Sequence, residues 1–209
     1  MSRRTAVAAA CLALLPLAGL VAGCSGGTAD SGTPSAARLA EPSATAPSSF
    51  APLPSPALES RALTGPHYRI SIPAAWTDRT DTSSTAQIKP VVAEKPDAAA
   101  GRPIWVGIVV DDQAASDVYD QSLVLESSKR LAGATAITRT ALAWPGAQRA
   151  VLIGWEETPR GGGSGPVRYL QLMAQVRQGL IVNAVAQAPT EDFGAAGLDR
   201  VLRSLVVTG

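Results

Sequence analysis

Apolar and polar residues alternate with two different periods along this chain, and the places where the period changes predict its elements. Residues 104–110 are apolar on both faces, so we expect them near the centre of a sheet that is covered on both sides. Pro90 interrupts the predicted strand at residues 85–93, so this segment is expected to be an edge strand or a bulge. The predicted strands are residues 67–73, 85–93, 104–110, 136–144, 149–158, 167–177 and 180–188.

Residues 113–131 change to the 3.6-residue period of a helix. Two aspartates lie near the beginning of this segment, and Lys129 and Arg130 lie near its end, which matches the charge preference of the helix dipole. Gly133 is suited to end the helix. The predicted apolar stripe consists of Ala114, Val118, Ser122, Leu125 and Ala132.

The C-terminal third predicts an antiparallel meander followed by a second helix. Gln178 and Gly179 separate two strand-like segments, which is the signal of a tight hairpin. Thr190 is expected to cap a terminal helix that packs on the sheet through one apolar face. That face consists of Phe193, Gly197, Val201 and Leu205, with Leu198 and Leu202 beside it.

The N-terminus has the pattern of an export signal. Arg3 and Arg4 precede an apolar run at residues 6–22, whose 17 residues are fewer than the roughly 20 that cross a bilayer comfortably. Small residues lead up to Cys24. We therefore assign residues 1–23 to a signal peptide that is removed.

Residues 21–24, Val-Ala-Gly-Cys, resemble the bacterial lipobox. This resemblance implies that the chain is cut before Cys24, that the thiol of Cys24 receives diacylglycerol, and that palmitate-type chains anchor the protein to the outer face of the cell membrane. The alternative is an ordinary secreted protein, cut near Ala22 or Gly23, that keeps Cys24 as a free thiol. Cys24 has no partner for a disulfide, because Cys11 lies in the apolar run.

The remaining chain divides by composition. Residues 24–62 are rich in Pro, Ser and Ala, and such a segment cannot bury enough apolar surface to fold, so we predict a disordered tether. Its run Pro52-Leu53-Pro54-Ser55-Pro56 is either a stiff spacer or a docking motif. Residues 63–209 hold eight of the nine aromatic residues and no cysteine, which predicts one domain that is stabilised by packing alone.

The charge balance excludes some classes of partner. The chain carries 18 Lys and Arg residues against 17 Asp and Glu residues, and removal of Arg3 and Arg4 leaves 16 against 17. A net charge near −1 gives no electrostatic reason to bind nucleic acid or an anionic lipid surface.

The predicted domain has few residues suited to catalysis or metal binding. Its one histidine, His67, follows Pro66 at the start of a strand, where a solvated turn residue is the simpler interpretation. Ser164 lies in a glycine-rich connection rather than in a nucleophile elbow. Asp111 and Asp112 are neighbours in an extended segment and point to opposite faces. We expect no catalytic residue, no metal and no cofactor.

The candidate binding residues are aromatic or polar side chains in apolar segments. Core packing is the simpler interpretation for each of the four tryptophans, but Trp144 and Trp155 would form an exposed apolar patch if they shared one face. Asn183 is polar within an apolar strand, where a hydrogen bond inside the sheet competes with contact to a ligand. The candidates are Trp76, Trp144, Trp155 and Asn183.

The order of the predicted elements resembles the PsbP-like fold, and within it the LpqN-type lipoproteins of actinobacteria. The likeness is carried by residues 68–76, Tyr-Arg-Ile-Ser-Ile-Pro-Ala-Ala-Trp, by residues 182–186, and by Phe193 and residues 202–205. It implies an α/β class, with an α/β/α sandwich around a mostly antiparallel sheet of about six or seven strands and two main helices. Members of this fold are mostly docking or accessory subunits.

These observations lead to three functional hypotheses. The first is a non-enzymatic, lipid-anchored envelope protein that docks onto a membrane or cell-wall protein complex. The second is a binder of a small lipid or glycan, which a closed apolar cavity of more than about 300 Å³ between helix and sheet would favour. The third is a hydrolase with a scattered active site.

Overall fold

The structure, a computed structural model, describes residues 49–53, 59–80, 90–96, 98, 102–159 and 165–209. The chain divides into two compact units, Met1–Ala40 and Glu41–Gly209, and every described residue belongs to the second. The predicted signal peptide and most of the predicted tether therefore lie outside the described residues. Neither described helix is long and apolar enough to cross a membrane.

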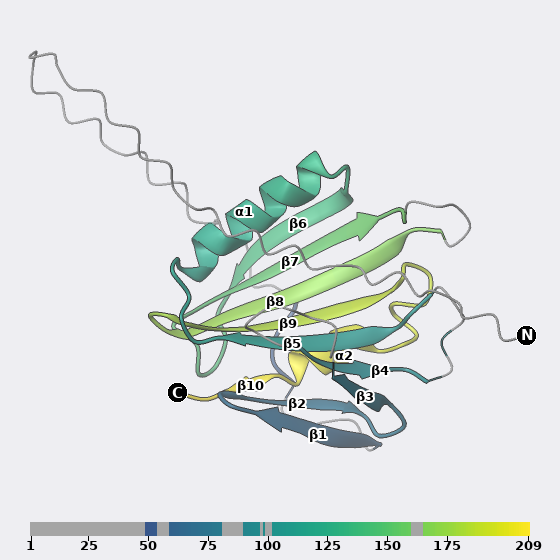
Figure 1. Cartoon of the computed structure of the whole chain (residues 1–209), viewed down its shortest axis with the longest axis horizontal. Helices are drawn as coiled ribbons and strands as arrows, with labels where there is room; N and C mark the ends of the chain where they lie inside the picture. The colour runs from purple at the N-terminus through teal and green to yellow at the C-terminus, as the bar shows by residue number, and fades with distance from the viewer. Residues whose placement is uncertain (1–48, 54–58, 81–89, 97, 99–101, 160–164) are drawn as a thin grey trace, which may run out of the picture. The chain divides into compact units, whose positions relative to one another are not determined.

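In the described part of the chain, a seven-stranded antiparallel sheet forms the main layer (Figure 1). Its spatial order is β3-β4-β5-β9-β8-β7-β6, so β9 holds the middle position and β5, the strand expected at the centre, lies beside it. The strands are β3 (Thr77–Thr80), β4 (Val91–Glu94), β5 (Trp105–Asp111), β6 (Thr135–Leu142), β7 (Arg149–Glu157), β8 (Val167–Arg177) and β9 (Leu180–Pro189).

The meander predicted for residues 148–187 is confirmed, because β7, β8 and β9 pair in sequence, each antiparallel to the next. β6 extends it by pairing antiparallel with β7. Gln178 and Gly179 form the two-residue connection between the paired residues Arg177 and Leu180. The weaker strand expected at 85–93 is β4, which begins at Val91, and residues 81–89 lie outside the described residues.

A second, three-stranded sheet consists of β1 (Ser60–Gly65), β2 (Tyr68–Pro73) and β10 (Val206–Val207). β2 is the predicted first strand, and it pairs with β1 along its whole length. The residues at the other end of the chain complete this sheet, because Val206 and Val207 pair with Arg69 and Tyr68. The sequence pattern predicted neither β1, β3 nor β10.

Helix α1 (Val118–Leu131) confirms the first predicted helix but begins later than residue 113. The Asp117 side chain accepts hydrogen bonds from the backbone N–H groups of Tyr119 and Asp120 and so caps the helix there. Gly133 follows the helix with φ of 84°, as expected for a residue that ends it.

The second predicted helix is much shorter than expected. Helix α2 spans only Leu198–Arg203, and Thr190 does not cap it. Gly197 precedes the helix with φ of 66°, a left-handed conformation that no residue inside an α-helix adopts. Residues 190–197 instead form a series of turns that still bury Phe193.

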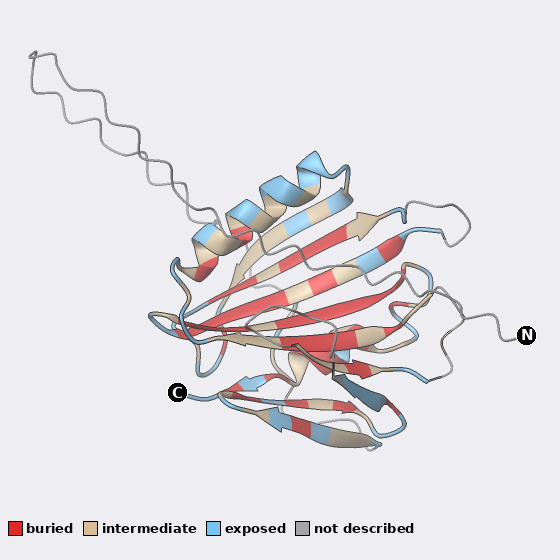
Figure 2. Cartoon of the chain, in the orientation of Figure 1, coloured by how far each residue is buried: buried red, intermediate tan, exposed pale blue. Residues whose placement is uncertain are grey.

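The two faces of the large sheet bury different sets of side chains. Most residues of the central strands are buried (Figure 2). Successive residues of a strand point to opposite faces, and the central strands are apolar at both sets of positions. Helix α1 packs mainly on β6, β7 and β8, where its Val118 joins Trp155, Val151, Ile153, Met173 and Ile181. Helix α2 and the small sheet cover the other face, and their core includes Ile70, Ile72, Leu172, Ala184, Leu198 and Leu202. The expected α/β class and antiparallel sheet are confirmed.

The folded region begins before Leu63, contrary to the predicted boundary. Ser60, Arg61 and Ala62 belong to β1 and pair with Pro73, Ile72 and Ser71.

The separate stretch 49–53 also contacts the domain. There the backbone N–H of Leu53 donates to the Arg203 carbonyl at 2.8 Å, and Arg203 Nε donates to the Ala51 carbonyl at 2.7 Å. The Phe50 ring stacks on Trp144 with 6.1 Å between ring centroids. The described parts of the predicted tether therefore add apolar and backbone contacts to the fold.

We predict that a chain beginning at Leu63 is less stable than one beginning at Ser49, by about 2 to 3 kcal/mol, because it loses half of β1 and the partly buried Phe50. Urea unfolding of both chains measures the difference. In the longer chain, Phe50→Ala should cost about 1 kcal/mol. Equal unfolding midpoints for the two lengths would contradict this boundary.

Candidate functional site

The structure separates the two tryptophans that the sequence suggested as a patch. Trp144 and Trp76 lie in the core beneath α2 and the small sheet, whereas Trp155 lies under α1 on the other face. Trp144 and Trp155 are each 4% exposed. Trp144 Nε1 donates to the Leu205 carbonyl at 3.2 Å, so its polar atom is also satisfied internally. These residues pack the core and do not form a surface patch.

Trp155 belongs to a cluster with aromatic and ionic contacts under the end of α1. Its ring stacks on Tyr169 of the adjacent strand, with centroids 5.0 Å apart and an interplanar angle of 3°. Glu157 Oε1 accepts from Trp155 Nε1 and from Lys129 Nζ, both at 2.8 Å. Lys129 Nζ also lies 4.7 Å from the Trp155 ring centroid, a cation–π contact. The cluster ties α1 to the sheet.

Asn183 lies on the same face of the sheet as Trp155 but farther along, beyond the strands on which α1 mainly packs. No described helix covers this part of β9 together with β5 and β4. We call this surface the β4–β5–β9 face, and its half-buried side chains come from three strands and the neighbouring β8. It consists of Val92, Glu94, Trp105, Val109, Asn183 and Gln171, with the buried Gly107 between Trp105 and Val109 on β5.

Strand register places Trp105 on this face and holds its ring close to the backbone. Trp105 is paired with Gln187 of β9, and Gly107 is the next residue of β5 on the same face. A Cβ atom at Gly107 would lie 3.1 Å from the Trp105 ring and 3.7 Å from Val92. The absence of a side chain at Gly107 thus lets the Trp105 ring lie over the strand, with part of its surface still exposed.

The polar groups of this face are amides and one carboxylate, because Glu94 of β4 lies opposite Trp105 and is ion-paired with Arg79. Gln171 Nε2 donates to Asn183 Oδ1 at 3.2 Å, which supports the interpretation of Asn183 as a hydrogen-bonded sheet residue. Gln187 Nε2 donates to the Pro103 carbonyl at 3.5 Å. An exposed indole surface beside amide groups suits a neutral partner that offers apolar surface and hydrogen bonds. The sequence pattern did not distinguish Trp105 from the other tryptophans, because its exposure depends on where α1 ends.

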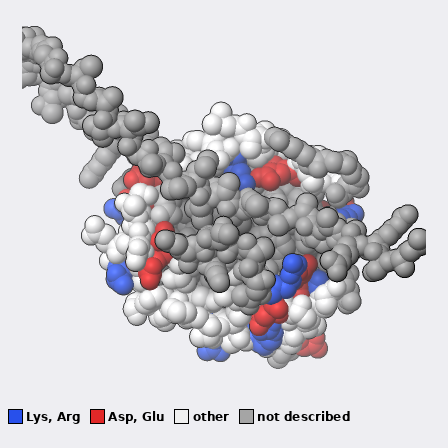
Figure 3. All heavy atoms as spheres, viewed as in Figure 1, with Lys and Arg blue, Asp and Glu red and all other residues white. Residues whose placement is uncertain are grey.

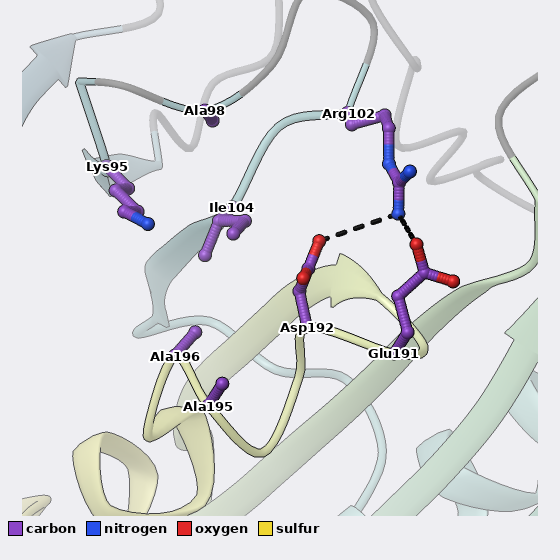
Figure 4. A pocket seen from close by; sticks show the side chains of 8 residues that line it. All are labelled: Lys95, Ala98, Arg102, Ile104, Glu191, Asp192, Ala195 and Ala196. Carbon is purple, nitrogen blue, oxygen red and sulfur yellow. Dashed lines mark hydrogen bonds and ion pairs between the residues drawn. The ribbon is translucent and has the colours of Figure 1, made fainter.

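A hollow of about 320 Å³ lies between the loop after β4 and the turns after β9 (Figure 4). Arg102 bridges Glu191 and Asp192 on its wall, and the hydrogen bond to Glu191 raises the pKa of Arg102. Its other lining residues are Lys95, Ala98, Ile104, Ala195 and Ala196. The hollow is open and ionic, and it lies away from α1, so it is not the closed apolar cavity that would favour a lipid or glycan binder.

A second hollow lies on the side of α1 that faces away from the sheet. We call its lining residues the outer stripe of α1, and Val124 and Leu131 within it are 69% and 90% exposed. The outer stripe consists of Leu123, Val124, Ser127, Ser128 and Leu131. Three of these five residues are apolar and none is charged, unlike the solvent side of most surface helices.

Charged residues elsewhere are mixed in sign, as Figure 3 shows for one face. His67 has φ of 65° in the β1–β2 connection, and its Nδ1 lies 3.2 Å from the Thr208 carbonyl, which is consistent with a turn residue. Within the described ranges, no three His, Cys, Asp or Glu side chains are grouped so that they could hold a metal.

No protein-family model matches the chain, and no curated protein is significantly similar to it.

We predict a loss of stability at high pH that depends on Tyr169. Burial, and to a lesser degree the carboxylate of Glu157, raises the pKa of Tyr169 to about 12. The unfolded chain releases this proton near pH 10, so the folded state holds more protons between about pH 10 and 12 and loses stability as the pH rises through that range. Urea unfolding should show a steeper decline in wild type than in Tyr169→Phe, which keeps the ring stack. Parallel declines would contradict the assignment.

Proposed function

We propose that this chain is a lipid-anchored envelope protein of the LpqN type whose PsbP-like α/β domain acts as a non-enzymatic docking module. In this proposal, residues 1–23 are removed and Cys24 carries the acyl chains on the outer face of the cell membrane. Two or three acyl chains on one residue hold a protein stably, whereas a single chain holds it only marginally. The partner is a protein of a membrane or cell-wall complex.

The observation that carries the docking proposal is the exposed part of Trp105 on the β4–β5–β9 face. Tryptophan is enriched among the residues that dominate the binding energy of protein interfaces. Most neighbouring side chains are uncharged, and the carboxylate of Glu94, opposite Trp105, is already paired with Arg79. A partner surface can therefore cover this face without burying an unpaired charge. The half-buried amides of Gln171 and Asn183 can add hydrogen bonds to a partner.

A neutral glycan is the second candidate for the same face. An indole with amides beside it can stack on the apolar side of a sugar ring and hydrogen-bond its hydroxyl groups. Docking to a protein is favoured because the face is spread over several strands, and because the hollow at Arg102 is open and ionic rather than apolar.

We predict that Cys24→Ala abolishes labelling by palmitate and moves the protein from the membrane fraction to the soluble fraction. Cys11→Ala is the matched control and should change neither result, because Cys11 lies in the segment that is removed. Labelling and membrane fractionation of full-length variants in cells measure both. A Cys24→Ala protein that still labels and still sediments with membranes would rule out this anchor.

We predict that Trp105→Ala weakens binding of the envelope partner at least about tenfold, the size expected for a central aromatic residue of an interface. Cross-linking in intact cells, followed by purification, measures the partner recovered with the full-length protein. Val206→Ala, an exposed position on the small sheet, is the control and should keep wild-type recovery. Equal urea midpoints show that both variants are folded.

The same cross-linking experiment distinguishes docking to a protein from binding of a glycan. One stoichiometric protein that is lost in Trp105→Ala supports docking. Recovery of glycan alone, also lost in Trp105→Ala, favours the second candidate. Recovery that Trp105→Ala does not change would contradict both uses of this face.

A further inference from the structure

Helix α1 presents apolar residues on two opposite sides. Val118, Ser122 and Leu125 face the sheet, as the helical period predicts. The outer stripe faces away from it, and no described segment covers Leu131, which is 90% exposed. Packing on the sheet does not require these outer residues to be apolar, so they point to a contact that the isolated domain does not make.

The charges around the stripe are already paired, with one exception. Asp117 pairs with Arg149, Lys129 with Glu157, and Arg130 with Glu126, at 2.6, 2.8 and 2.7 Å. Among the described residues, exposed Asp120 has no ion-pair partner. It lies one turn before the apolar part of the stripe, and Arg130, whose side chain is 64% exposed, lies near the other end.

We propose that the outer stripe packs against the outer stripe of a second copy of this chain, with the two helices antiparallel. A twofold axis between Val124 and Ser127 sets Val124 level with Ser127 of the second copy, and Leu123 level with Ser128. Val124 and Leu123 each then meet a serine, which favours close packing of the helices. Leu131 lies level with Asp120 of the second copy.

The same alignment brings opposite charges together at both ends. Asp120 of each copy lies level with the last turn of the other helix, where the long side chain of Arg130 can reach it. Arg130 would exchange its ion pair with Glu126 for one with Asp120 of the second copy, and Glu126 would keep Arg139 as its partner, at 2.8 Å. Parallel helices would instead place Asp120 beside Asp120. Charge therefore selects the antiparallel pairing.

A bilayer surface is a poorer occupant of the stripe. Helices that lie on anionic membranes carry unpaired Lys and Arg residues along their polar side. Helix α1 instead carries two carboxylates, Asp120 and Glu126, beside its two cations, Lys129 and Arg130. The hydroxyl groups of Ser127 and Ser128 would also lose water without gaining a partner in the acyl region.

The proposed contact between the two copies is small, so it is expected to form only at high local concentration. Five stripe residues per copy are well below the roughly 20 to 30 residues per partner of a stable interface. The pair should therefore be weak in dilute solution and populated where a shared membrane raises the effective concentration. This last step rests on the proposed lipid anchor, whereas the pairing itself does not.

Disulfide trapping tests the alignment. Two full-length, differently tagged forms are placed in the same lipid vesicles, one with Val124→Cys and the other with Ser127→Cys, and are oxidised. Residue 124 of one copy and residue 127 of the other then lie at the same height along the two helices. Their Cα atoms come within the roughly 7 Å that a disulfide needs. We expect the mixed dimer to exceed either homodimer several-fold. Gln178→Cys, on the exposed β8–β9 turn, is the control and should give no dimer. If Cys24 proves not to be lipidated, the same pair is oxidised in solution at about millimolar concentration.

Exchanging the charges of Asp120 and Arg130 tests whether the two α1 helices are antiparallel. Asp120→Arg should lower the yield of mixed dimer about fivefold, the size expected for the loss of two exposed ion pairs. Adding Arg130→Asp to the same chain should restore it. The proposal is overturned by dimers no more abundant than in the control, by cross-links only to lipid or to another protein, or by a double variant that stays as low as Asp120→Arg.

Discussion

The fold depends on one constraint, which is that the central strands of the large sheet are apolar on both faces. Leu172 and Ala184 face one side, and Met173 and Ile181 face the other. Both faces must therefore be covered. The small sheet and α2 cover the first, whereas α1 is the one described helix that packs on the second. A 14-residue helix is about 21 Å long and about 10 Å wide, which is too narrow for seven strands spaced about 4.8 Å apart.

The candidate site lies on the part of this sheet face that α1 leaves uncovered. Helix α1 follows β5 in the chain but packs on β6 to β8, and its cap at Asp117 is fixed there by Arg149 of β7. The face of β5 beside it thus keeps no described helix. Trp105 partly compensates, because its ring lies over Gly107 and Val92 and shields the strand from water. The partial exposure of Trp105 is a consequence of the sheet being wider than α1.

Local periods in the sequence were enough to predict most of the sheet and α1. They failed where long-range pairing decides the structure. β10 has two residues and exists only because Val206 and Val207 reach β2, more than a hundred residues earlier. The tryptophans show the same limit. Trp144 and Trp155 are apolar residues of neighbouring segments, and only the path of the chain after β6 decides which face each one joins. Trp105 could not be singled out, because no local signal shows which strands α1 leaves uncovered.

The two proposed contact surfaces, the β4–β5–β9 face and the outer stripe of α1, lie on the same side of the sheet. Helix α1 stands as a ridge on that side, with the β4–β5–β9 face beside it (Figure 1). Two copies joined ridge to ridge would bring their β4–β5–β9 faces to opposite sides of a gap about two helix diameters wide, roughly 20 Å. A partner segment in this gap could touch Trp105 of both copies. Each contact is weak alone, but two in one complex bind with the product of their affinities, scaled by the effective concentration. Pairing through α1 would therefore strengthen docking without any change in the docking face.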